Sequence, residues 1–198
     1  MVLLISVSIA CNKVVVTSGD TLTVPEKESL SFMREEEKLA FDVYQRMYDK
    51  WGLMPFGSIR QSEARHMAAI KTLLDKFQLP DPSAGKAAGE FENTIITGLY
   101  TSLTQSGDSS EVQALLAGGA IEEIDIRDLQ DLLLKINRED IRTVFEELMR
   151  GSRNHLRAFV SNLAARGITY TPRYLSEAAF NEIISSPMER GSGNRPGH

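Results

Sequence analysis

The 198-residue sequence has little of the residues that mark several common protein classes. It has one cysteine, which excludes any disulfide within the chain. Its 22 lysines and arginines are outnumbered by 27 acidic residues and form no cluster on one predicted face, which argues against a nucleic-acid-binding surface. An internal repeat of solenoid length is also lacking. What remains is the composition of a globular protein, 42% hydrophobic and 25% charged, with the length of one domain plus tails.

The apolar run over residues 1–10 is too short to cross a bilayer as a helix, and it ends at Cys11. Such a run is typical of the apolar region of a secretion signal. The stretch SIAC resembles the lipobox of bacterial lipoproteins, although Ser8 stands where leucine is usual and no basic residue precedes the run. We therefore expect a signal segment over residues 1–11, secretion to the bacterial cell envelope, and membrane contact only through a lipid on Cys11. The alternative is a buried N-terminal strand with a structural cysteine.

From about Ser29 the hydrophobic residues recur with the period of helices, and no strand alternation of useful length follows, so we predict an all-α fold. Residues 12–28, rich in Val, Thr, Ser and Gly, predict a tether. Helices are predicted over residues 29–51, 58–79, 93–105, 110–136, 137–167 and 176–185, with a Pro- and Gly-rich crossing loop before the third. The predicted helix caps and stops are Ser110, Asn137, Gly52 and Gly167.

Four of these helices are long and amphipathic, and one extended crossover joins them. This pattern indicates a four-helix bundle with short accessory helices over residues 29–186, followed by a disordered tail over residues 187–198.

The inward stripe of each long helix is apolar except near its middle, where residue types that bind metal interrupt it. Glu63 and His66 are three residues apart, a spacing that puts both on one face of a helix. Buried carboxylates without partners are costly, so something must neutralise them. Two divalent cations would balance four carboxylates, and two imidazoles complete a nitrogen and oxygen donor set that suits iron, manganese or zinc. The predicted metal ligands are Glu37, Glu63, His66, Glu122, Asp125 and His155.

Some of these assignments have rivals in the sequence. Glu36 competes with Glu37, which is favoured by its phase and by Tyr44 further along the same stripe. Tyr44 itself either hydrogen-bonds a ligand or only packs. Asp125 either binds metal or orients a histidine through a hydrogen bond. For the Glu-x-x-His pair, the alternative is a surface ion pair or a hydrogen bond along the helix face.

Four stretches, FMREEEKLAFDVY, SEARHMAAIKTLL, GAIEEIDIRDL and GSRNHLRAF, together resemble the DUF2202 family over about residues 29–167. The ligand order is also similar to the ferritin-like di-iron carboxylate superfamily, the rubrerythrins in particular. This resemblance implies a ferritin-like bundle that holds two iron ions. Ferritin-like sites carry Glu three residues before the last histidine, whereas this sequence has Ser152, so one carboxylate is missing unless Asp125 replaces it. No Cys-x-x-Cys pair is present, so the rubredoxin-like iron module of full rubrerythrins is absent.

Three functional hypotheses follow. The first is a dinuclear iron centre that oxidises or sequesters Fe(II) with oxygen or peroxide, as in a ferroxidase or peroxidase. The second is a lipid-anchored helical module without enzymatic activity, in which one metal ion such as zinc braces the bundle. The third has no metal and requires carboxylates of raised pKa in a hydrogen-bonded core. The expected partners are metal ions and, by analogy with such bundles only, a second copy of the chain.

Overall fold

The computed structural model describes residues 21–191, and within this range the chain has helices but no strand. The predicted all-α class is therefore confirmed. The six helices are α1 (Val24–Trp51), α2 (Met54–Lys76), α3 (Thr94–Gly107), α4 (Glu111–Leu133), α5 (Glu139–Ala164) and α6 (Glu177–Ser185). No helix in this range is both long enough and apolar enough to cross a membrane. The predicted signal segment and the lipid anchor on Cys11 lie outside the described residues.

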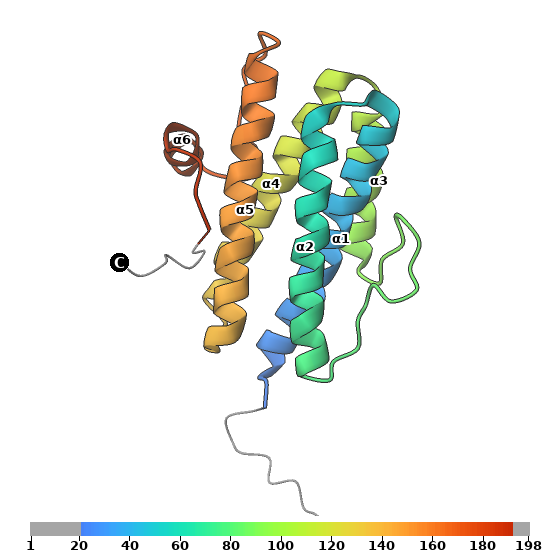
Figure 1. Ribbon diagram of the computed structural model, residues 1–198, viewed down its shortest axis with the longest axis vertical. Helices are drawn as coiled ribbons and strands as arrows, with labels where there is room; N and C mark the ends of the chain where they lie inside the picture. The colour runs from blue at the N-terminus through green and yellow to red at the C-terminus, as the bar shows by residue number, and fades with distance from the viewer. Residues whose placement is uncertain (1–20, 192–198) are drawn as a thin grey trace, which may run out of the picture.

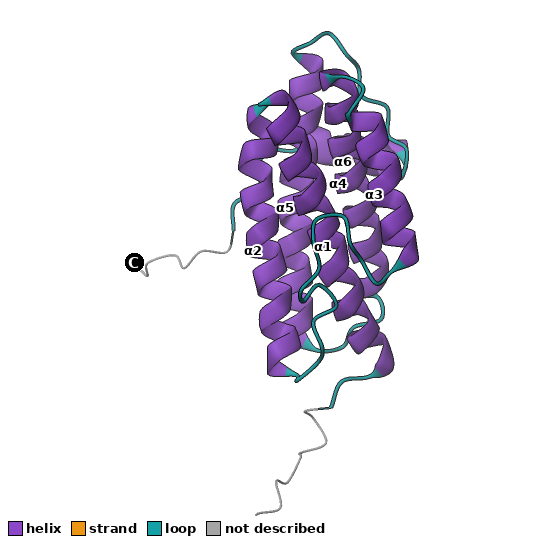
Figure 2. Ribbon diagram, turned by 90° about the vertical axis from the view of Figure 1, so that its right-hand side faces the viewer, coloured by secondary structure: helices purple, strands orange, loops and turns teal. Residues whose placement is uncertain are grey.

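Four long helices, α1, α2, α4 and α5, lie side by side as a helical bundle (Figure 1). Short connections make α1 antiparallel to α2 and α4 antiparallel to α5 (Figure 1). A long loop and α3 then carry the chain from the end of α2 back along the bundle to the start of α4, with α3 packed against α1 and α4. Figure 2 shows this crossover loop lying over α1. The long crossover expected from the sequence is thus present.

Two of the four helix ends that the sequence predicts have the expected cap. The side chain of Ser110 accepts a hydrogen bond from the first turn of α4, and Gly52 ends α1 at a φ of 66°, as predicted. Asn137 does not cap α5, because Glu26 holds the backbone N–H groups of both Asn137 and Arg138, and Arg138 occupies the cap position. The turn that contains Gly167, at a φ of 73°, follows shortly after the end of α5.

The first helix begins inside the predicted tether. Thr23 and Glu26 form a capping box in which the Thr23 hydroxyl accepts from the Glu26 N–H at 3.3 Å and the Glu26 carboxylate accepts from the Thr23 N–H at 2.9 Å. Pro25 lies in the first turn, where its missing N–H costs nothing. The tether prediction for residues 12–28 is therefore wrong from Val24 onward, because this cap outweighs a composition without helical period.

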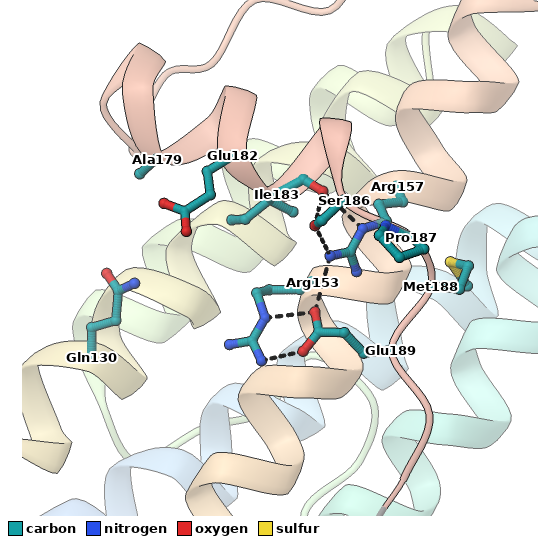
Figure 3. Close-up of a pocket in the computed structure, with 10 residues that line it drawn as sticks. All are labelled: Gln130, Arg153, Arg157, Ala179, Glu182, Ile183, Ser186, Pro187, Met188 and Glu189. Atoms are coloured by element: carbon teal, nitrogen blue, oxygen red, sulfur yellow. Dashed lines mark hydrogen bonds and ion pairs between the residues drawn. The ribbon is translucent and has the colours of Figure 1, made fainter.

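The predicted disordered tail is wrong for residues 187–191, which we call the C-terminal strap. The strap lies against α5, where Glu189 pairs with Arg153 and, at 3.0 Å, with Arg157 (Figure 3). The Asn154 side-chain amide also donates to the Glu189 carbonyl at 2.9 Å. Together with α6, the strap borders a cavity of about 490 Å³ beside α5 (Figure 3). Glu189 thus links the strap to α5 through two arginines and Asn154.

The apolar core is divided into two clusters along the bundle. One cluster contains Tyr44, Phe56 and Phe159, whose ring centroids are 5.4–5.8 Å apart. The other contains Met33 and Phe145, from the opposite parts of α1 and α5. Each long helix passes from one cluster to the other close to its predicted polar positions. The two clusters therefore enclose a polar layer from above and below.

Candidate metal centre

Five of the six predicted ligands form two groups that share Glu63. One group, the His66 half, consists of Glu37, Glu63 and His66, and the other, the His155 half, consists of Glu63, Glu122 and His155. Within each group, one donor atom of each residue lies within 4.8 Å of the others. We call these five residues the centre. They come from α1, α2, α4 and α5, so only the assembled bundle brings them together.

Both imidazoles direct the Nδ1 atom toward carboxylates. His66 Nδ1 lies 3.1 Å from Glu37 Oε2 and 2.8 Å from Glu63 Oε2. His155 Nδ1 lies 2.9 Å from Glu63 Oε1 and 3.5 Å from Glu122 Oε2. The two oxygens of Glu63 therefore face different histidines, whose ring centroids are 5.7 Å apart. A carboxylate placed in this way can hold two cations at once.

The centre contains buried polar atoms that the described residues leave unsatisfied. Glu37 Oε1, Glu63 Oε1 and His155 Nδ1 make no hydrogen bond within residues 21–191; the last two atoms are close but are not aligned as donor and acceptor. Such orphaned atoms are rare in folded proteins. Carboxylate oxygen and imidazole nitrogen are the donor atoms that iron, manganese and zinc accept. The residues present thus fit a pair of divalent cations.

Asp125, the sixth predicted ligand, lies in neither half of the centre. Its Oδ2 accepts a hydrogen bond from the Ser152 hydroxyl, while its Oδ1 is buried and without a hydrogen-bond partner among the described residues. The pKa of Asp125 is raised to about 7. Burial is the largest cause, the Ser152 hydrogen bond acts against it, and the charges of Glu122 and Glu63 add to it. The structure therefore places this carboxylate beside the centre, with a hydrogen bond to a serine and none to a histidine among the described residues, so it does not orient His66 or His155.

Of the two rival glutamates on α1, the structure brings Glu37 to the histidine. Glu36 is equally buried but faces α4, where burial and the nearby charges of Asp125 and Asp128 raise its pKa. Its Oε2 also lacks a hydrogen-bond partner among the described residues. The polar layer therefore extends beyond the centre toward α4.

The ionisation of the centre is set by competition between burial and charge. Burial raises the pKa of Glu37 and of Glu122, although the facing imidazoles oppose the shift. Burial also acts on Glu63, but His155 and His66 outweigh it, and the pKa of Glu63 is lowered. Burial opposes protonation of His155, yet Glu63 and Glu122 raise its pKa to about 10, and the pKa of His66 is raised in the same manner. Without metal, an ionised Glu63 thus lies between two protonated imidazoles, and metal must displace protons to bind.

Tyr44 orients Glu122 from the opposite side. Its hydroxyl donates to Glu122 Oε1 at 2.5 Å, which leaves Oε2 facing His155. Burial and the charge of Glu122 raise the pKa of Tyr44, so the hydroxyl keeps its proton. The tyrosine ring packs against Phe56 and Phe159 at the same time. Tyr44 therefore does not only pack, because its hydroxyl also hydrogen-bonds Glu122, one of the predicted ligands.

Three further buried glutamates, which we call the backbone-bound glutamates, serve a different purpose. Glu26, Glu35 and Glu123 each accept hydrogen bonds from backbone N–H groups of a segment far away in the sequence. Glu123, for example, accepts from three successive N–H groups at 2.8–3.0 Å, those of residues 173–175. Sequence reasoning missed all three. Only Glu26 carries a readable signal, the Thr-x-x-Glu capping box.

A cavity of about 490 Å³ between α2 and α5 is lined by the two histidines. The side chains of His66 and His155 keep 13% and 11% of their surface exposed, whereas those of Glu37, Glu63 and Glu122 keep only 2–3%. Solvent therefore approaches the centre from its histidine side.

The chain is similar to a known protein family and to a relative of known structure. Residues 26–187 match the family described as an uncharacterized protein domain, DUF2202. The chain is 51% identical over 166 residues to the uncharacterized protein MJ0754 of Methanocaldococcus jannaschii, an alignment that covers 84% of this chain and 90% of that protein. The crystal structure of hypothetical protein MJ0754 from Methanococcus jannaschii matches with a TM-score of 0.83 at 49% identity, covering 85% of this chain and 97% of that one.

Proposed function

The chain belongs to the DUF2202 family, and we propose that it is a ferritin-like protein whose centre binds two divalent metal ions, iron foremost, for redox chemistry with oxygen or peroxide. The observation that supports this most is the position of Glu63, with one oxygen toward each histidine. Each half of the centre adds one further carboxylate, Glu37 or Glu122. Two equivalent donor sets joined by one glutamate are what a dinuclear site requires.

Charge balance favours two ions over one. Glu37, Glu63, Glu122 and Asp125 carry four negative charges when ionised, which two divalent cations balance. Burial already keeps some of these groups protonated in the metal-free protein, so each bound ion replaces protons on carboxylates and imidazoles. A single ion would occupy only one half of the centre and leave the carboxylates of the other half balanced by protons alone.

When bound, two iron ions supply two electrons in passing from Fe(II) to Fe(III), which is what the reduction of hydrogen peroxide with two protons to two water molecules consumes. The residues of this chain would hold the ions and orient the ligands. Glu63 would hold both ions, while the Tyr44 hydroxyl fixes the direction of Glu122. The apolar clusters on either side exclude water except through the cavity between α2 and α5.

Asp125 takes the place of the carboxylate that Ser152 does not provide. The Ser152 hydroxyl holds one oxygen of Asp125, and the other oxygen is buried without a partner among the described residues. Asp125 lies three residues after Glu122 on α4, so both are on the same face of that helix, and the charges of Glu122, Glu63 and His66 act on it. In this proposal Asp125 would complete the ligand set of the two ions.

The proposal is tested by metal loading. Protein from which metal has been removed with a chelator is incubated with Fe(II) in the absence of oxygen. Bound iron per chain is then measured by elemental mass spectrometry. Hydrogen peroxide is then added and ferric absorption is followed, with Glu63→Gln as the control. Two irons per chain and a ferric signal absent from the control are expected. Fewer than one ion per chain would refute the proposal. One tightly held ion without redox response, and a large loss of melting temperature on chelation, would instead favour a structural brace.

A further inference from the structure

Gly151, in α5, lies against the ring of His66. A Cβ added at residue 151 would lie 2.7 Å from both Cε1 and Nε2 of His66. Carbon atoms of unbonded side chains do not approach so closely. The same Cβ would be 3.9 Å from Cε1 of His155, which is an ordinary contact. The ring of His66 therefore occupies space that a side chain at residue 151 would need, whereas the ring of His155 does not.

The backbone of α5 does not explain this glycine. Gly151 lies within the helix, and it is not among the glycines with a φ that other residues avoid. Glycine is disfavoured inside helices, so an alanine would suit this position better if local structure alone decided. What distinguishes glycine from alanine at this position is the close approach of the His66 ring, which leaves no space for a methyl group.

The His66 ring is confined at both edges. Its Nδ1 edge faces Glu37 and Glu63 at 3.1 and 2.8 Å, and its Nε2 edge faces Gly151. A methyl group at residue 151 must push the ring away. The ring is the end of a side chain, and the cavity between α2 and α5 lies next to it. The ring can swing into that cavity, which withdraws Nδ1 from the two carboxylates without unfolding the bundle.

We propose that Gly151 is a positioning residue of the centre, because its missing side chain allows the His66 ring to reach Glu37 and Glu63. The His66 half then depends on glycine at residue 151, whereas the His155 half does not. This inference rests on the proposed function insofar as it concerns metal. Its geometric part, the position of the ring, concerns the metal-free protein as well.

The test compares Gly151→Ala with two control variants. A Cβ at Gly57, in α2, would lie 2.6 Å from the ring of Tyr48, so Gly57→Ala makes an equally close contact with an aromatic ring that is not part of the centre. A Cβ at Gly98, in α3, would meet nothing within 4 Å, so Gly98→Ala introduces only the methyl group. Chelator-stripped proteins are titrated with Co(II), whose visible spectrum reports nitrogen and oxygen ligation, and bound cobalt is counted.

Two cobalt ions per chain are expected for the parent protein and both controls, and one for Gly151→Ala. The metal-free Gly151→Ala protein should still unfold in one cooperative transition. His66→Ala should also bind one, and adding Gly151→Ala to it should cause no further loss, because both changes act through the same ring. A crystal structure of metal-free Gly151→Ala should show Nδ1 withdrawn from Glu37 and Glu63.

The possible failures are distinguishable. Two cobalt ions bound to Gly151→Ala, with the His66 ring unmoved in the crystal, would overturn the role of Gly151 and leave the proposed function intact. No cobalt bound to the parent protein would refute the proposed function. In that event the crystal structure alone decides, and an unmoved ring would overturn the positioning role as well.

Discussion

Six of the seven buried glutamates among the described residues form two sets that differ in what they face, and Glu36 belongs to neither. The backbone-bound glutamates meet N–H groups of distant segments, as when Glu35 accepts from the Asn93 N–H at 3.1 Å and so ties the crossover loop to α1. The glutamates of the centre meet imidazoles and leave oxygen atoms unpartnered among the described residues. Both sets are 4% exposed or less. A buried carboxylate is thus not by itself a sign of a metal site; its partners decide.

The largest effect is expected when the carboxylate shared by both halves of the centre, Glu63, is removed. Glu63→Gln should abolish loading of both metal ions, because each half of the centre loses a charged ligand. The rise in melting temperature on metal addition should disappear with it, since one ion at a concentration of 100 Kd contributes about 2.7 kcal/mol to the free energy of unfolding. Elemental analysis and thermal melting with and without metal measure this. Glu35→Gln is the matched control and should keep both ions; two ions on Glu63→Gln would contradict the assignment.

The opposite result is expected for Glu123, one residue along from Glu122. Glu123→Gln exchanges a charged acceptor for a neutral amide opposite three backbone N–H groups, so it should lower the free energy of unfolding by about 2–4 kcal/mol. Metal loading should stay at two ions. Chemical denaturation and elemental analysis separate the two effects. Tyr170→Phe, which removes a single donor to Glu123, should cost about 1 kcal/mol, and a loss of metal in either variant would erase the distinction between the sets.

Asp125 differs from both sets of glutamates in that we expect its contribution to stability to change near neutral pH. Burial raises its pKa to about 7 in the metal-free protein, so folding favours the protonated form. The stability from this group is fully present below its ordinary pKa and is lost as pH rises through about 7. Asp125→Asn cannot titrate. It should therefore melt at least about 3 °C above the parent protein near pH 8, with little difference near pH 4. Melting curves of chelator-stripped protein across this range test it; a difference that does not change with pH would show that Asp125 is already ionised.

The smallest effect is expected at Tyr44. Tyr44→Phe keeps the ring in the apolar cluster and removes only the hydroxyl that orients Glu122. Affinity for one of the two ions should fall by about 10-fold or more, as for other groups that orient a metal ligand, while both ions still bind at high concentration. A cobalt titration resolves the weakened step. Equal loss of both ions would show that the hydroxyl acts on the whole bundle rather than on the His155 half.

Much of the fold could be read from the sequence because helical periodicity and caps are local. The stripes placed Glu63 and His66 on one inward face, and Ser110 and Gly52 marked helix ends. The start of α1 and the C-terminal strap were missed for one physical reason. Each depends on side-chain partners, Glu26 for Thr23 and two arginines for Glu189, that composition and periodicity do not register.

The sequence by itself determined which residues lie on the inward face of each helix, because a period of about 3.6 residues fixes that face. Only the tertiary structure decided what each of those residues meets. Glu36 and Glu37 are neighbours in the chain, yet the packing of α1 turns one toward α4 and the other toward His66. The side chain missing at Gly151 gains a meaning only when α5 lies against α2. Contacts between helices depend on distances that no local pattern encodes.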